Sequence, residues 1–119
     1  LLKAHLQRGE PVEETKIGIN DDELKVAREG MRQAVGEGGT AAALNISGIE
    51  LAGKTGTAQV GTRNQYMNSW VIGFWPASAP KYAFAVVLEK APAGTNSGAA
   101  PAMSQFFYWL RDAKPEYIQ

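Results

Sequence analysis

The sequence predicts an α+β domain in which a short antiparallel sheet packs against helices. An amphipathic helix over 20–37 precedes three strand patterns within 49–90, and a second amphipathic helix over 97–113 follows them. The connections between the strand patterns are short, so neighbouring strands should be antiparallel. We therefore expect a three-strand meander with packing helices, all within one domain of 119 residues.

The first helix has clear signals at both ends. Asn20 is a favourable N-cap, and Glu23, three residues later, completes a capping box. Glycines between 36 and 39 end the helix. One apolar face is expected from residues at helical spacing: Leu24, Ala27, Met31, Ala34 and Val35. Before the helix, residues 1–19 contain the turn signal RGEP and predict a loose hairpin or an extended arm.

The three strands are expected over about 49–60, 68–77 and 81–90. The second and third are apolar on both faces, which predicts a sheet covered on both sides. We expect Trp70, Phe74 and Trp75 of the second strand in the core.

The last helix is expected to pack on the sheet. Ser97 is a candidate cap, and Pro101 suits the first turn. An i, i+3, i+4, i+7 stripe predicts the buried face: Met103, Phe106, Phe107 and Leu110.

Composition limits the chemistry of the chain. The formal net charge is zero, which argues against nucleic acid as a partner. There is no cysteine and one histidine, so disulfides, thiolate catalysis and His- or Cys-rich metal sites are excluded, and we expect no metal and no cofactor. No apolar run approaches the roughly 20 residues that a membrane span needs. The chain begins at Leu1 rather than Met, so we expect a fragment or a processed product.

The stretch ELAGKTGTAQV, residues 50–60, places a lysine between two glycines on a predicted strand. Strands disfavour interior glycine, so Gly53 and Gly56 need a reason. We expect them to keep the strand open, so that the backbone of an extended ligand can approach and pair with it. Lys54 offers an ammonium, and Thr55 and Thr57 offer hydroxyl donors, a combination that suits a carboxylate.

Strand alternation places Thr55 and Thr57 on one face and Lys54 on the other. A ligand that meets all three must lie along the edge of the strand, which favours an extended, peptide-like substrate. The N–H of Thr57 then suits a developing oxyanion. A K-T-G tripeptide also occurs by chance in many proteins, and the alternative is a solvent-exposed lysine beside a strand bulge.

The wider context of the motif resembles a known family. GMRQAV, a glycine-rich stop, GTAAALN and ELAGKTGTAQV together resemble class B penicillin-binding proteins, especially the penicillin-binding protein 2 type. The tail NSGAAPAMSQFFYWL resembles that family's closing glycine-rich loop and last helix, so the resemblance runs from about Asp21 to Leu110. It implies the C-terminal part of a transpeptidase domain, with three strands here of a five-stranded sheet that carries helices on both faces.

The resemblance also implies a function. The family consists of serine acyl-transferases that cross-link peptidoglycan stem peptides and are acylated by β-lactams. Lys54, Thr55 and Gly56 then belong to the third signature motif, K-T-G. Thr57 would hold the carboxylate of substrate or antibiotic and lend its N–H to the oxyanion hole, so Lys54 and Thr57 are the catalytic candidates. The implied location is the outer face of the cytoplasmic membrane, with an anchor that is absent here.

The nucleophile of the family is not found in this sequence. The family carries S-x-x-K and S-x-N upstream of K-T-G, but the only upstream serine, Ser47, has no lysine three residues on. Ser78 to Lys81 fits S-x-x-K as a string, yet it lies in a tight connection between strands and after K-T-G. Tyr66 to Asn68 fits a Y-x-N variant, also after K-T-G. We expect the chain alone to be inactive and to work with the remainder of the domain, which carries both motifs.

Three alternatives remain open from the sequence. A β-lactam-sensor domain shares the motif, and a multi-pass membrane anchor in the parent protein would indicate it. A D,D-carboxypeptidase or serine β-lactamase relative would transfer the acyl group to water, and its deacylation rate would distinguish it. A non-catalytic binding module with an accidental K-T-G would lack S-x-x-K upstream in the parent gene.

Overall fold

The computed structural model describes residues 9, 11, 14–16, 18–94 and 98–118. The arm expected over 1–19 lies mostly outside these residues, and so does the expected cap Ser97. The elements follow in chain order: α1 (Asp21–Val35), the short 3-10 helix η1 (Ala42–Leu44), β1 (Ala52–Val60), β2 (Tyr66–Trp75), β3 (Tyr82–Pro92), α2 (Ala99–Ala113) and the 3-10 helix η2 (Pro115–Tyr117). No described helix is both long and apolar enough to cross a membrane.

The sheet is the predicted meander. Its order is β1-β2-β3, and both pairs of strands are antiparallel. One irregularity interrupts it, where Glu89 and Lys90 of β3 lie opposite the single residue Asn68 of β2. Lys90 takes a φ of 55° at this bulge, and its N–H donates to Asn68 Oδ1 at 2.9 Å. Among the described residues, the outer edges of β1 and β3 have no strand partner.

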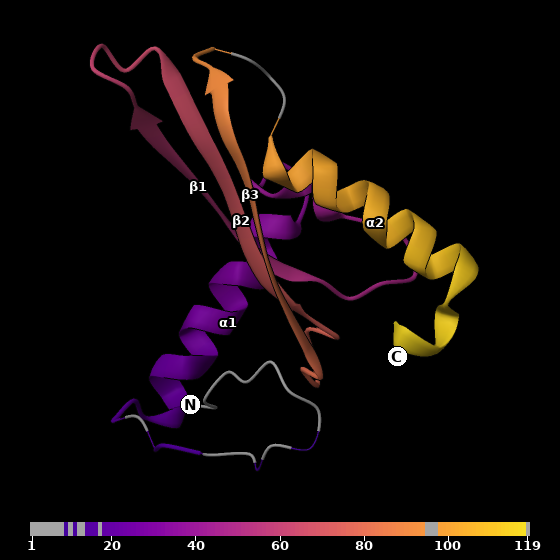
Figure 1. The fold of residues 1–119 in the computed structure, drawn as a ribbon. Coiled ribbons are helices and arrows are strands. Elements are labelled where there is room, and N and C mark those ends of the chain that lie inside the picture. Colours follow the sequence, from indigo (N-terminus) through magenta and orange to yellow (C-terminus); the bar gives the residue numbers. More distant parts are fainter. Residues whose placement is uncertain (1–8, 10, 12–13, 17, 95–97, 119) are drawn as a thin grey trace.

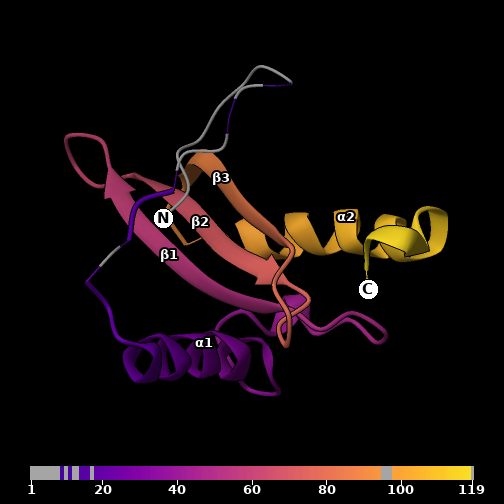
Figure 2. The same ribbon diagram turned by 90° about the horizontal axis from the view of Figure 1, so that it is seen from below.

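Helix α2 covers one face of the sheet, and α1 lies beside the edge strand β1 (Figures 1 and 2). The core lies between α2, η1 and the covered face. Phe107 of α2 is fully buried, and its ring meets Trp75 edge-on at 5.1 Å and Phe84 at 5.4 Å between centroids. Such edge-to-face contacts add to the stabilisation from burial. This packing fixes α2 against β2 and β3.

The packing of α2 differs from the expected stripe in one residue. Met103, Phe107 and Leu110 are buried as predicted, whereas Phe106 is 40% exposed. The small residues Ala99, Ala100 and Ser104 are buried as well. The N-cap position is Gly98, which provides no side-chain hydrogen bond.

Helix α1 has the predicted start, and its predicted apolar face is buried only in part. Asn20 Oδ1 accepts from the Glu23 N–H at 2.9 Å, and the Asn20 N–H donates to Glu23 Oε2 at 3.1 Å, so the capping box is confirmed. Of the expected apolar face Val35 is buried, Leu24, Met31 and Ala34 are half-buried, and Ala27 is exposed. The reason is that α1 meets β1 through its C-terminal end, while its earlier turns extend past the sheet (Figure 1).

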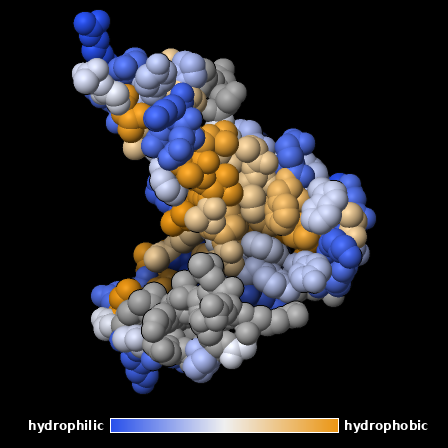
Figure 3. Space-filling model, viewed as in Figure 1, coloured by the Kyte–Doolittle hydropathy of each residue, from blue (hydrophilic) through white to orange (hydrophobic). Residues whose placement is uncertain are grey.

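The described residues cover the face of the sheet away from α2 only in part, contrary to the expectation of two covered faces. Trp70 is 42% exposed and Ile72 is 47% exposed on the face away from α2, so the expectation that Trp70 lies in the core is wrong. Trp75 is buried, and Phe74 is half-buried. Hydrophobic surface gathers over the middle of the sheet in the space-filling view (Figure 3). We name the exposed face with Trp70 and Ile72 the open face.

Candidate substrate-binding wall

The register of β1 and β2 fixes where the motif side chains lie. Thr55 pairs with Val71 and Thr57 pairs with Ser69, and Val71 is buried under α2. Lys54 pairs with Ile72 on the open face. Paired residues share a face in an antiparallel sheet. Both threonines therefore lie on the α2 face and Lys54 on the other, as alternation predicted.

Lys54 carries a charge that no described carboxylate neutralises. Its side chain is exposed, and its Nζ donates to the carbonyl oxygen of Thr55 at 2.5 Å. No ion pair joins it to the part of the chain that the structure describes. A carbonyl oxygen is a neutral acceptor, so no described residue offsets the positive charge that Lys54 offers to an anionic ligand along the β1 edge.

The two glycines of the motif strand have different surroundings. A Cβ on Gly53 would lie 3.3 Å from the Ile72 carbonyl oxygen and 3.3 Å from Leu44 Cδ1, so this buried glycine serves internal packing. The expectation that Gly53 keeps the strand open for a ligand is therefore wrong. A Cβ on Gly56 would meet only Trp70 Cβ, at an ordinary 3.6 Å, and Gly56 is exposed. The fold itself leaves room for a side chain at Gly56.

One further residue belongs to this wall and was missed from the sequence. Ser69 lies directly across from Thr57, and its Oγ accepts the N–H of Ala99 at 2.9 Å. The start of α2 is thereby held beside the motif strand. A register worked out through the β1–β2 hairpin would have paired Thr57 with Ser69, and this signal was available in the sequence.

Ser47 and Ser78, the two serines considered as nucleophiles from the sequence, lie outside the motif strand, in turns of the chain. Ser78 lies in the turn between β2 and β3, and its Oγ donates to Glu50 Oε2 at 2.6 Å. Ser47 is exposed in the turn before β1. Ser69 is near the motif, but its oxygen accepts a backbone N–H and Lys54 lies on the opposite face. None of the three is paired with a described lysine that could take its proton.

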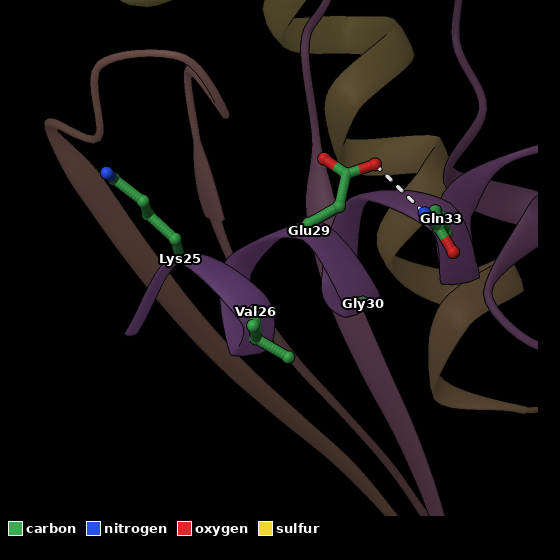
Figure 4. A pocket seen from close by; sticks show the side chains of 5 residues that line it. All are labelled: Lys25, Val26, Glu29, Gly30 and Gln33. Atoms are coloured by element: carbon green, nitrogen blue, oxygen red, sulfur yellow. Dashed lines mark hydrogen bonds between the residues drawn. The ribbon is translucent and has the colours of Figure 1, made fainter. Parts of the chain in front are cut away.

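A second surface feature lies on α1, away from the motif. A shallow hollow of about 430 Å³ is lined by Lys25, Val26, Glu29, Gly30 and Gln33, all from this one helix (Figure 4). Glu29 accepts two hydrogen bonds from Arg32 and one from Gln33, each at 3.0 Å. These bonds, that from Arg32 first, hold the pKa of the Glu29 carboxyl below its ordinary value. The carboxylate is thus already paired, which leaves the hollow little to offer a ligand.

In the described part of the chain, no three His, Cys, Asp or Glu side chains lie close enough together to hold a metal ion.

Comparison with known proteins identifies the class of the chain. Residues 1–108 match the model of the penicillin-binding protein transpeptidase domain. The chain is 34% identical over 117 residues to the peptidoglycan D,D-transpeptidase MrdA of Acinetobacter baumannii, covering 86% of this chain and 17% of that protein. The chain thus spans about one sixth of the length of this curated relative.

Solved structures give the same result for the fold. Penicillin-binding protein 2B of Streptococcus pneumoniae superposes with a TM-score of 0.69 at 24% identity, over 84% of this chain and 17% of that chain. Penicillin-binding protein 2 of Pseudomonas aeruginosa, solved in complex with WCK 5153, superposes with a TM-score of 0.65 at 28% identity, over 91% and 24%.

The chain belongs to the penicillin-binding protein transpeptidase family. It corresponds to a C-terminal part of a class B transpeptidase domain, which confirms the resemblance drawn from the K-T-G strand and its flanks.

Proposed function

We propose that this chain forms the K-T-G substrate-binding wall of a peptidoglycan D,D-transpeptidase. The observation that carries the proposal is an edge strand with an unpaired ammonium at Lys54 and open space at Gly56. Family membership supports the reaction class, because the A. baumannii relative is named a peptidoglycan D,D-transpeptidase. The substrate is the stem peptide of peptidoglycan, and β-lactams occupy the same wall.

The roles follow from the chemistry of the edge. Lys54 attracts the carboxylate of the ligand, and the hydroxyls of Thr55 and Thr57 donate to it. Gly56 lets the ligand backbone lie against β1 as an added strand. The N–H of Thr57 stabilises the oxyanion that forms when the ligand carbonyl is attacked.

The nucleophile comes from the remainder of the parent protein. Acyl transfer needs a serine with a base within hydrogen-bond reach, and S-x-x-K on the missing part supplies both. The open face with Trp70 and Ile72 supports this division, because apolar side chains so exposed are covered in a complete domain. The chain alone does not acylate. The parent protein acts outside the cytoplasmic membrane, where its substrate is, held by an anchor outside this chain.

Intact-mass spectrometry with benzylpenicillin tests the proposal. The full-length parent protein should gain the mass of the drug, and the 119-residue chain alone should gain nothing. The parent with Lys54→Ala should be labelled much more slowly. An adduct on the isolated chain would overturn the division of labour and return attention to Ser78 and Ser47. Rapid loss of the adduct from the parent would indicate a carboxypeptidase or β-lactamase instead.

A further inference from the structure

Ser69 joins three parts of the proposed wall that lie far apart in the sequence. It faces Thr57 of β1 on one side and Leu88 of β3 on the other. Its Oγ accepts the N–H of Ala99, the first residue of α2. The side chain therefore lies on the same sheet face as Thr57 and touches the start of the helix that covers this face.

Ser69 of β2 makes a close contact with the first residue of α2 and accepts its backbone N–H. Gly98, at the N-cap, gives no side-chain hydrogen bond to the helix. Ser69 accepts the N–H of Ala99, one of the first helix N–H groups that have no partner within the helix. A Cβ on Gly98 would lie 3.2 Å from Ser69 Oγ, tighter than an ordinary contact. Ala99 is fully buried, so its N–H would lose its partner without gaining water if Ser69 lost its hydroxyl.

The position of α2 bears on the charge of the wall. The N-terminal end of a helix carries partial positive charge from its free N–H groups. Ser69 is the cross-strand partner of Thr57, the proposed carboxylate binder, and its hydrogen bond to Ala99 holds the N-terminal end of α2 next to this pair. A shift of α2 moves both the positive end and the surface against which a ligand at Thr57 rests.

We propose that Ser69 is a positioning residue for the carboxylate-binding side of the wall, acting through Thr57 and the N-terminus of α2. It is not a nucleophile, because its oxygen accepts a backbone N–H and Lys54 lies on the other face of the sheet. The proposal rests on the proposed function, since it assumes that Thr57 receives a ligand carboxylate. It predicts that Ser69 affects the binding of ligands that carry this carboxylate more than it affects the acylation step.

The test uses the full-length parent protein and stopped-flow acylation by benzylpenicillin, which separates the dissociation constant of the first complex from the limiting acylation rate. Ser69→Ala should raise the dissociation constant about fivefold, which is the loss expected for one neutral hydrogen bond. It should change the limiting acylation rate by less than about twofold. Ser69→Thr keeps the hydroxyl and should behave as the wild type. Ser104→Ala is the control, because Ser104 is a buried serine near the start of α2 whose hydroxyl donates to the Pro101 carbonyl oxygen within the helix.

The methyl ester of benzylpenicillin separates a positioning role from a general loss of structure. Ser69→Ala should leave the weak binding of the ester unchanged, measured by competition with a fluorescent penicillin. Gly98→Ala, which crowds Ser69 Oγ while keeping the hydroxyl, should give the same selective loss and serves if Ser69→Ala does not fold.

The outcomes separate the two proposals. If Ser69→Ala and Gly98→Ala behave as the wild type, or weaken acid and ester alike, Ser69 is not a positioning residue. Thr57→Ala in the same assay tests the underlying function. If it leaves the preference for acid over ester intact, the carboxylate role of Thr57 fails, whatever Ser69 does.

Discussion

Gly73 shows how closely the covered face of the sheet is packed. A Cβ at this position would lie 2.3 Å from the Ala52 carbonyl oxygen and 2.6 Å from two ring atoms of Phe84. We expect Gly73→Ala to destabilise the chain by about 3 kcal/mol, because neither backbone nor a packed ring gives way cheaply. Thermal unfolding followed by circular dichroism measures this. Gly30→Ala is the control, since a Cβ there meets nothing within 4 Å and alanine favours a helix. Equal stability of the two variants would contradict the packing argument.

Lys54 is the residue on which the proposed wall depends most. We expect Lys54→Ala in the full-length parent to lower the second-order rate constant of acylation by benzylpenicillin about 10- to 100-fold, the range for a charged hydrogen bond of about 1.5–3 kcal/mol. Lys25→Ala removes an exposed lysine of α1 and should leave this rate unchanged. If the second-order rate constant of Lys54→Ala lay within about a factor of two of the wild-type value, this ammonium would not bind the ligand.

At the scale of elements, α1 depends on its cap because the sheet supports only its C-terminal end. Asn20 and Glu23 satisfy each other's backbone N–H groups in the capping box. We expect Asn20→Ala to lower the free energy of unfolding by about 1 kcal/mol, and Asn20→Ser to restore most of it. Chemical denaturation of the chain measures both. If alanine and serine were equivalent at residue 20, the cap would not contribute.

The same helix gives a pH prediction through Glu29. The hydrogen bonds from Arg32 and Gln33 hold the pKa of Glu29 below its ordinary value of 4.5 in the folded chain. The folded state therefore binds this proton less readily than the unfolded state, and the stabilisation is complete above pH 4.5 and lost as the pH falls through the lowered folded value. The effect is small and salt-dependent, because the pair is exposed. The free energy of unfolding, measured from about pH 6 down to about pH 2, should fall less steeply in Glu29→Gln than in the wild type. An unchanged pH profile would show that the pair of Glu29 and Arg32 does not contribute to stability.

At the scale of the whole molecule, the open face predicts an interface with the rest of the transpeptidase domain. Trp70 is 42% exposed here, whereas Trp75 is 7% exposed. In variants that keep one tryptophan, iodide should quench Trp70 fluorescence strongly in the isolated chain and weakly in the full-length parent. Trp75 should resist quenching in both. Strong quenching of Trp70 in the parent would show that the open face stays in water and is not where the remainder docks.

The order of the elements and most of their ends were predictable from local signals. The capping box, the glycines after α1 and the short connections between strands act over a few residues, so the sequence alone indicates the helix start and the meander. Alternation in one strand also predicted that Lys54 and the two threonines lie on opposite faces. The K-T-G motif and its flanks determined the family.

Only the tertiary structure decided which faces are covered. Trp70 and Trp75 are the same residue type five positions apart on one strand. Their burial differs because α2 covers the face of Trp75, whereas the described residues leave Trp70 exposed on the other face. Gly53 and Gly56 look alike in the motif, yet the Ile72 carbonyl oxygen and Leu44 crowd Gly53, while Gly56 has room for a side chain. The partnership of Ser69 with Ala99 joins residues 30 apart. Sequence patterns report each segment's own preferences, whereas these contacts depend on where distant segments meet.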